Sequence, residues 1–371
     1  MSQLSSPDLS AGLPMPISIP RRQSHSSAHR PFRSSVAKAG FADSRLAFLT
    51  QRARTTNLAV CLLAAVAVLS ILINIRLWLN DEVFRRKDDA ASPIPASIRA
   101  TLQAPNPYSN LKHLVMVPGH AIWQGCDASH ATEDADWVLE PMQRGGAVRT
   151  YLKHIIKGVE IAVRDPEALL IYSGGQTRPH STLTEALSYA RLAKAGNLYS
   201  QFMTDSQRQA AAAQGGEFDR ATTEDFAMDS MQNVLFSVAR FREVTGRWPT
   251  FITVVGYGMK RRRYEDVHRA ALRWPASAFK YIGIDNEGET SGDYEGEKAN
   301  EGVYGAQRKF GLEPFLRDTY GCHGGLMAKR RNRNPYRRFH SYHTSVPELS
   351  RLFEYCPSSA TTLFPGPLPW D

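Results

Sequence analysis

Cysteine is scarce in this chain, which has four cysteines in 371 residues and no Cys-x-x-Cys pair. That scarcity argues against a zinc ribbon and against a thioredoxin-like redox motif. Cys61 lies inside a long apolar run, while Cys126, Cys322 and Cys356 are widely separated. One disulfide among these three would suit a lumenal domain, and three thiols would suit a cytosolic one, so the cysteines leave the compartment open.

Several catalytic motifs are also absent. The sequence contains no Gly-x-Ser-x-Gly elbow, no Walker phosphate loop and no His-Glu-x-x-His helix. These absences argue against an ordinary serine hydrolase, a P-loop NTPase and a zincin. Gly256-x-Gly258 matches only part of a dinucleotide fingerprint, because Arg261 occupies the place of the third glycine.

Positive charge is concentrated at the N-terminus. Residues 1–56 hold eight Lys/Arg and two acidic residues, so this tail carries six of the nine net positive charges. The remaining 315 residues carry only +3, so no nucleic-acid partner is expected for the folded part. The stretch 5–35 is rich in Ser, Pro, Arg and His, which predicts a disordered tail.

One long hydrophobic run follows the tail. Residues 57–79 are almost wholly apolar and long enough to predict a single transmembrane helix, with a buried soluble helix as the alternative. Residues 80–111 contain four prolines and predict a stem. The positive-inside bias favours a cytosolic tail on a single-pass protein of an endomembrane or the plasma membrane, with membrane lipid as a partner. An Arg- and Ser-rich, acid-poor N-terminus also fits a mitochondrial presequence.

Residues 112–371 alternate between strand and helix patterns. Short apolar runs predict strands at 113–117, 168–172, 250–255 and 279–284. Helical periodicity occupies the intervals 148–163, 183–195, 227–244 and 262–272. This alternation predicts an α/β domain with a mostly parallel sheet. The segments 286–300 and 329–338 are predicted to be insertions outside that sheet.

Three of the predicted strands end in glycine followed by polar residues. The carboxyl ends of parallel strands meet at one edge of an open sheet, where ligands bind. We therefore expect a ligand crevice at this edge. The residues expected to line it are Gly119, Ser173, Gly174, Gly175, Gly256 and Gly258.

The order of these motifs resembles the SanA/ElyC/YdcF-like family, which is domain-of-unknown-function family 218. The matching blocks are Ser173-Gly174-Gly175, Thr184-Glu185-Ala186 and, more loosely, Glu224 to Asn233. The resemblance implies a three-layer Rossmann-like domain, often membrane-anchored and linked in bacteria to envelope biogenesis, with no settled reaction. In the last block Met259 stands where the family has His, and Arg262 falls at the family's Arg.

Glu185 and Glu224 are the candidate catalytic carboxylates, because the family order brings them to one crevice. There they could act in acid–base chemistry or hold a divalent metal such as Mg²⁺. The alternatives are structural: Glu185 would complete a capping box that starts at Thr182, and Glu224 would favour a helix dipole in a first turn. Asp229 and Asn233 are four residues apart, which fits either a ligand-binding pair or a solvated helix face.

A run of basic residues follows the third glycine-ended strand. Cations at the start of a helix oppose its dipole unless an anion lies between them, so Lys260 and Arg262 are predicted to bind phosphate. A second basic tract is expected to contact acidic lipid or an acidic loop. The tract consists of Lys329, Arg330, Arg331, Arg333, Arg337 and Arg338, and the loop of Asp285, Glu287, Glu289, Asp293, Glu295 and Glu297.

Three hypotheses for function follow from these patterns. The first is a membrane-anchored domain that binds an anionic, phosphate-bearing small molecule or lipid headgroup and hydrolyses or transfers it. The second is a nucleotide or S-adenosylmethionine binding protein, with Gly256 and Gly258 near the ligand. The third is a noncatalytic membrane scaffold. Cys322-His323 and His340-x-x-His343 are weaker metal-ligand candidates, because such pairs are usually core or surface residues.

Overall fold

The computed structural model describes residues 58–77, 96–102, 105–213, 215, 218–286 and 302–371. The chain divides into two compact units, Met1–Glu82 and Val83–Asp371. The tail at 1–56, much of the stem at 80–111 and nearly all of the acidic loop lie outside the described residues.

The described part of the first unit is one apolar helix, Leu58–Leu77. Its mean hydropathy is 2.8 and none of it is buried. By length and composition this helix can cross a bilayer. The prediction of a membrane-length apolar helix is therefore confirmed in its coarse form, while the side and kind of membrane stay predictions.

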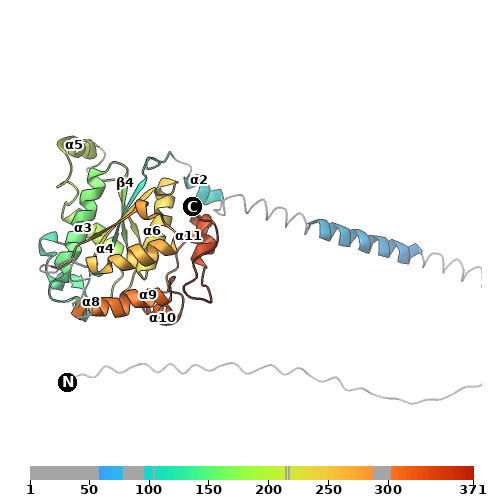
Figure 1. Cartoon of the computed structure of the whole chain (residues 1–371). Coiled ribbons are helices and arrows are strands. Elements are labelled where there is room, and N and C mark those ends of the chain that lie inside the picture. Colours follow the sequence, from blue (N-terminus) through green and yellow to red (C-terminus); the bar gives the residue numbers. More distant parts are fainter. Residues whose placement is uncertain (1–57, 78–95, 103–104, 214, 216–217, 287–301) are drawn as a thin grey trace, which may run out of the picture. The chain divides into compact units, whose positions relative to one another are not determined.

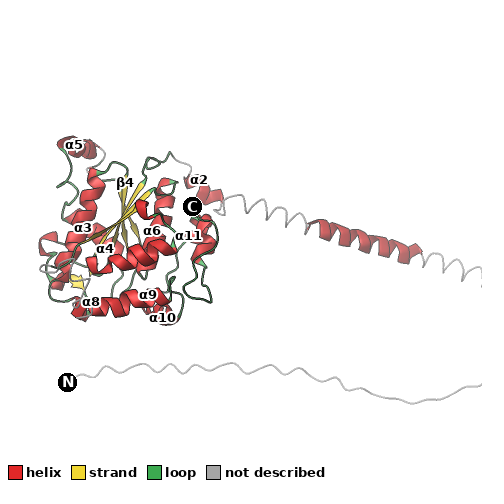
Figure 2. Ribbon diagram, viewed as in Figure 1, coloured by secondary structure: helices red, strands yellow, loops and turns green. Residues whose placement is uncertain are grey.

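The second unit is built on a five-stranded sheet that is parallel throughout (Figure 2). Its strands are β1 (His113–Pro118), β4 (Ala168–Ser173), β5 (Ala221–Glu224), β6 (Phe251–Gly256) and β7 (Phe279–Gly283). Their order across the sheet is β5-β4-β1-β6-β7. The predicted α/β class with a mostly parallel sheet is confirmed. A separate antiparallel pair joins β2 (Ile122–Trp123) to β3 (Trp137–Val138).

Helices cover both faces of the sheet. Alternate strand residues point to opposite faces, so Val115 and Val117 belong to one buried cluster while Leu114 and Met116 belong to the other. The first cluster includes residues of α3 (Ala147–Arg164) and α4 (Glu185–Ala195), and the second includes residues of α6 (Ser230–Thr245). Because both faces are buried, the central strands are continuous apolar runs.

The remaining helices are short. They are α2 (Ala96–Leu102), α5 (Asp205–Ala213), α7 (Arg269–Ala271), α8 (Gly302–Gln307), α9 (Glu313–Arg317), α10 (Gly324–Asn332), α11 (Tyr342–Ser345) and α12 (Ser350–Phe353), with π-helical turns η5 (Arg263–His268) and η9 (Arg308–Leu312). Short 3-10 turns span Ala128–His130, Asp134–Asp136, Pro141–Gln143, Gly258–Lys260, Ala276–Ala278 and Pro347–Leu349. Figure 1 shows α8, α9 and α10 along the end of this unit opposite α5.

The sheet order reverses between β1 and β6. From β1 the chain moves outward through β4 to β5, then returns to β6 on the other side of β1 and continues to β7. In an open parallel sheet such a switch point opens a crevice at the carboxyl ends of the two strands. The fold therefore directs attention to the residues that follow Pro118 and Gly256.

Strand β5 was not predicted. It is a four-residue edge strand, Ala221–Glu224, without an apolar run. The prediction that Glu224 lies in the first turn of a helix is wrong, because this residue ends β5. Helix α6 begins six residues later, where the Asp229 side chain caps it by accepting the Gln232 N–H.

The folded unit also begins before the predicted boundary at residue 112. The Asn106 side chain donates to the Val244 carbonyl at 2.8 Å, and Leu111 is buried in the core. The end of the predicted stem is thus part of the domain.

A disulfide joins Cys322 to Cys356 and leaves Cys126 free and exposed. His323 lies between Cys322 and α10, and its Nε2–H donates a hydrogen bond to the Pro357 carbonyl at 2.8 Å. The link fixes the start of α10 to the C-terminal segment.

We expect loss of this disulfide to lower stability, because it closes a loop of 34 residues in the unfolded chain. Loop-closure entropy predicts a loss of about 3 to 4 kcal/mol for Cys322→Ser. Thermal unfolding with and without reductant measures the effect, and Cys126→Ser is the matched control. Equal melting temperatures for wild type and Cys322→Ser would contradict the prediction.

Candidate functional site

The three glycine-ended strands meet at one edge of the sheet, as predicted. Pro118 of β1 is in register with Ser173 of β4, and the Gly119 N–H donates to the Ser173 carbonyl at 2.7 Å. Strand β6, which ends at Gly256, pairs with β1 on its other side. The turns after β1, β4 and β6 therefore share the carboxyl edge.

Glu185 packs directly on two of these turns. A methyl group added to Gly119 would lie 2.5 Å from the Glu185 Cβ, and one added to Gly174 would lie 2.9 Å from it. The buried Glu185 carboxylate accepts a hydrogen bond from the Thr177 hydroxyl at 2.5 Å. Only glycine permits this close approach of helix and strand ends.

The predicted capping box at Thr182 is wrong. Thr184 is the N-cap of α4 and its hydroxyl accepts the Leu187 N–H at 2.9 Å. Glu185 is therefore the first helical residue, and its carboxylate contacts Thr177 instead of capping the helix.

The backbone N–H groups of the glycine turns are already used within the protein. Gly174 donates to the Glu224 carbonyl at 3.0 Å and Gly175 to the Ala227 carbonyl at 2.7 Å. Gly258 donates to the Asp285 carboxylate at 2.9 Å. An anion at this edge must therefore be held mainly by side chains.

Lys260 supplies the first of these side chains. Its ammonium nitrogen lies 3.3 Å from His120 Nδ1 and above the Tyr257 ring, 5.2 Å from the centroid. Burial lowers the pKa of Lys260 well below its usual range, and Arg263 and Arg333 lower it further. His120 has a pKa lowered by burial and then by Lys260, so both groups are biased toward their neutral forms.

Arg262 and Arg263 lie in different surroundings, and Arg263 is close enough to Lys260 and His120 to lower the pKa values of both. The Arg262 side chain is 66% exposed and lies 3.4 Å from Asp266, whereas Arg263 is buried. Burial lowers the pKa of Arg263, and no ion pair joins it to an acidic residue in the part of the chain that is described. Successive helical residues point about 100° apart, which separates these two neighbours.

Two arginines of the second basic tract contact residues that follow β5, at the carboxyl edge of the sheet. Arg330 donates to the Asp229 carboxylate at 2.5 Å and to the Tyr320 carbonyl at 2.7 Å, while Arg333 donates to the Met228 carbonyl at 2.9 Å. Loss of hydration, Arg333 and Arg263 lower the pKa of Lys329 to about 8, although its side chain is exposed. Arg330 and Arg333 thus contact the folded domain, and contact of the tract with acidic lipid or with the acidic loop stays a prediction.

Asp229 and Asn233 are both buried, so the solvated-face alternative is wrong. Burial alone would raise the pKa of Asp229, but Arg330, the Gln232 N–H and His268 together outweigh it and leave that pKa below its usual value. Asp229 serves as the cap of α6 and the anchor of α10.

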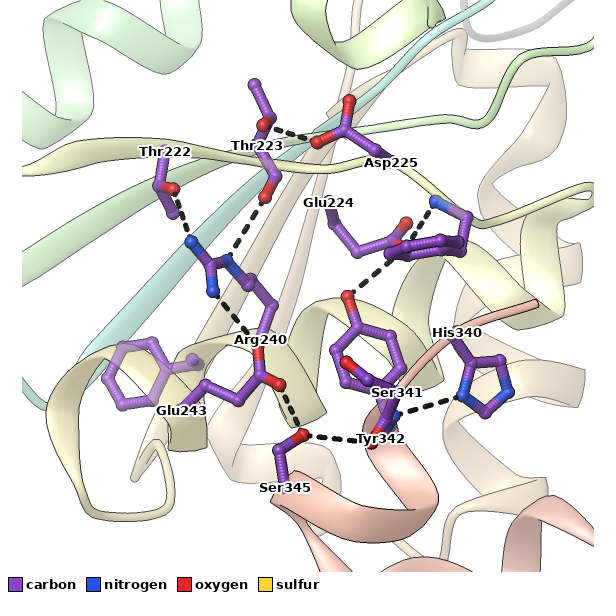
Figure 3. Close-up of polar contacts among 12 residues, drawn as sticks. Thr222, Thr223, Glu224, Asp225, Arg240, Glu243, His340, Ser341, Tyr342 and Ser345 are labelled. Carbon is purple, nitrogen blue, oxygen red and sulfur yellow. Dashed lines mark hydrogen bonds and ion pairs between the residues drawn. The ribbon is translucent and has the colours of Figure 1, made fainter. Parts of the chain in front are cut away.

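Glu224 belongs to a separate buried network with Ser173. The Ser173 hydroxyl lies 2.7 Å from Glu224 Oε2 and 3.0 Å from Asn233 Oδ1. Figure 3 shows Tyr342, whose hydroxyl donates to Glu224 Oε1 at 3.3 Å. Burial raises the pKa of Glu224 to about 7. The predicted pairing of Glu185 with Glu224 is therefore not seen as a shared contact, because each carboxylate has its own partners.

A divalent metal such as Mg²⁺ does not fit the described residues of the crevice. Mg²⁺ requires several oxygen ligands, whereas Glu185 is surrounded by glycine, Thr177 and cations. Cys322, His323 and Cys356 bring potential ligand atoms within 4.8 Å of one another, but their sulfurs form the disulfide. His340 and His343 stack on each other and on Phe339.

The chain is similar to the "Uncharacterized protein YOR238W" of Saccharomyces cerevisiae. The two are 27% identical over 265 residues, which cover 63% of this chain and 87% of the yeast protein. No protein-family model matches the chain, and no solved structure matches it significantly. The SanA/ElyC/YdcF-like resemblance stays a prediction.

We expect Gly119→Ala to destabilise the domain, because the new methyl group would overlap Glu185. Overpacking of this kind costs about 1 to 3 kcal/mol. Denaturant unfolding measures the change, and Gly325→Ala is the control because its added methyl would meet no atom within 4 Å. Equal losses in the two variants would contradict the close packing of Glu185.

Glu224 predicts a pH dependence of stability. Its folded-state pKa of about 7 lies above the ordinary value of 4.5, so unfolding releases a proton and stability falls as pH rises between these values. The free energy of unfolding is expected to fall by about 3 kcal/mol over this pH range. Glu224→Gln, which mimics the protonated form, should flatten this decline in denaturant unfolding from pH 4.5 to 8. Glu167→Gln, at an exposed position, is the control and should show the same decline as wild type. An unchanged decline in Glu224→Gln would refute a raised pKa of Glu224.

Proposed function

We infer that the second unit is a Rossmann-like domain that binds a phosphate-bearing anion at the crevice between β1 and β6. In chain order its strands lie 3-2-1-4-5 across the sheet, which is the doubly wound dinucleotide-binding order 3-2-1-4-5-6 without the sixth strand. The ligand is a small phosphorylated molecule or a lipid headgroup.

The observation that carries this proposal is the group of four cations at the crevice, Lys260, Arg263, Lys329 and Arg333. Lys260 contacts His120 after β1, and Arg333 contacts the Met228 carbonyl after β5. The other three cations lower the pKa of Lys260, and Arg333 also lowers the pKa values of Arg263 and Lys329. Like charges that are partly removed from water repel strongly, because the local dielectric constant is low. A bound anion would reverse this repulsion, and perturbed cations of this kind are typical of functional sites.

The catalytic form of the proposal is phosphoester or pyrophosphate hydrolysis or transfer. Glu185 is then the base that accepts a proton from water or from an acceptor hydroxyl, and the cations stabilise the charge that develops on phosphoryl oxygens. Its position beside the Gly119 and Gly174 turns supports this role. Ser173 and Glu224 have a structural role in this proposal, because both are fully buried and their hydrogen bond joins the ends of β4 and β5.

The membrane part of the proposal is a single-pass anchor at Leu58–Leu77. The Cys322–Cys356 disulfide supports a folded unit in an oxidising compartment, as in the lumen of an endomembrane or outside the plasma membrane. This arrangement agrees with a cytosolic basic tail.

We expect pyrophosphate to raise the melting temperature of the full chain in detergent, because a ligand of the native state stabilises it by mass action. Arg263→Ala should weaken this binding about 10- to 100-fold, the usual effect of losing a charge-assisted hydrogen bond. Arg262→Ala is the matched control and should bind like wild type, because its side chain lies outside the crevice.

Isothermal titration of the same variants gives the affinities directly. No stabilisation by pyrophosphate or inorganic phosphate would refute the anion site. If adenosine ligands alone stabilised the protein, the nucleotide or S-adenosylmethionine hypothesis would replace it. If neither class bound, the scaffold hypothesis would remain.

A further inference from the structure

The four cations of the crevice come from two separate segments. Lys260 and Arg263 follow β6 and lie three residues apart, whereas Lys329 and Arg333 lie four residues apart at the end of α10. Residues three or four apart share one face of a helix, so each segment presents a pair of cations. Two pairs can hold two phosphoryl groups.

Both segments are held in place by contacts outside the ligand site. Arg330 fixes α10 through the Asp229 carboxylate and the Tyr320 carbonyl, and the Cys322–Cys356 disulfide fixes the start of that helix. On the other segment, the Arg263 guanidinium lies against Gly311, where an added methyl would be 2.5 Å from Nη1. The two segments that carry the cations are therefore fixed before a ligand arrives, which reduces the entropic cost of binding.

The charge of the crevice exceeds that of a single phosphate. A bound anion favours the charged form of Lys260, which the neighbouring cations oppose in its absence. With all groups ionised, the four cations and the Glu185 carboxylate carry three net positive charges. A phosphate monoester carries about −1.5 to −2 at pH 7. A second phosphoryl group adds the charge needed for balance.

The crevice also repels the metal that commonly accompanies diphosphates. Of the other carboxylates described near it, Asp229 is paired with Arg330, and Asp285 accepts the Gly258 N–H. A divalent cation would face the same four positive charges that attract the anion. The cations themselves can neutralise phosphoryl oxygens, as arginine does through its fork of N–H donors.

We propose that the crevice binds a diphosphate group directly through Lys260, Arg263, Lys329 and Arg333, without a bridging metal ion. This inference rests on the proposed phosphate site and names its ligand class. The diphosphate belongs to a nucleotide or to a lipid, and the chemistry recognised in the crevice is common to both.

Isothermal titration of the full chain in detergent tests the proposal, with pyrophosphate and orthophosphate as probes in EDTA. Pyrophosphate should bind at least about tenfold more tightly than orthophosphate, as expected for a second set of charge-assisted contacts. Excess Mg²⁺ should weaken pyrophosphate binding, because it neutralises the free ligand. Parallel titrations with ADP and with geranyl diphosphate then identify the nucleotide or the lipid as the source.

A double variant, Lys329→Ala with Arg333→Ala, should lose the preference for pyrophosphate while keeping orthophosphate affinity within about threefold. Arg331→Ala with Arg337→Ala removes the same charge from exposed positions of this tract and should keep the preference. Unfolding midpoints of both double variants show whether the fold is intact. If the alanine double variant at Lys329 and Arg333 is unfolded, a double variant with Lys329→Gln and Arg333→Gln is used in its place.

Equal affinities of the wild type for the two anions would overturn the diphosphate assignment while leaving a phosphate site. A requirement for Mg²⁺ would overturn the metal-free mode of binding. Failure of both anions to bind would refute the proposed function itself, so the two failures are distinguishable.

Discussion

The packing of Glu185 against Gly119 and Gly174 is the constraint on which the crevice depends. Helix α4 can start at the carboxyl edge of the sheet only because two turns there lack a Cβ atom. The backbone N–H groups of the same turns donate hydrogen bonds to neighbouring carbonyls. The edge is therefore closely packed and its glycine N–H groups are engaged, so the proposed anion site relies on long side chains that reach the edge from outside the sheet.

Those side chains create an electrostatic conflict that the fold must sustain. Lys260 is held between His120 and the Tyr257 ring, and Arg263 is buried without an acidic partner among the described residues. The ion pair between Asp229 and Arg330 holds α10 over the edge and so offsets the repulsion among the cations. Like charges held close together lower the stability of a protein, and such arrangements are typical of sites that are organised before binding.

The sequence predicted the parts of the fold that depend on local pattern. Apolar runs at β1, β4 and β6 are buried on both faces, so each stands out from its polar flanks, and β7 stands out through Phe279, Tyr281 and Ile282 although Lys280 is exposed. Strand β5 escaped prediction because Ala221–Glu224 is short, polar and at the sheet edge. The glycine turns and Glu185 were identified from motif order, and the structure brings them together at one edge.

The cations were harder to predict, since their roles depend on tertiary contacts. Arg262 and Arg263 are adjacent and chemically identical, and only the rotation of the helix separates the exposed side chain from the buried one. The return of α10 to the sheet edge has no local signature, because its partners Met228 and Asp229 lie about a hundred residues earlier in the chain. Motif order likewise could not show that Glu224 faces Ser173 and Tyr342.

The contribution of α10 to the crevice has a consequence for how the protein is made. During synthesis on the ribosome, all five strands emerge before residues 322–356, which supply the helix and both cysteines of the disulfide. The same C-terminal part of the chain supplies Tyr342, Leu349 and Phe364 to the hydrophobic core on one face of the sheet. Completion of that core and arrival of the α10 cations at the sheet edge are therefore coupled to one late-emerging segment.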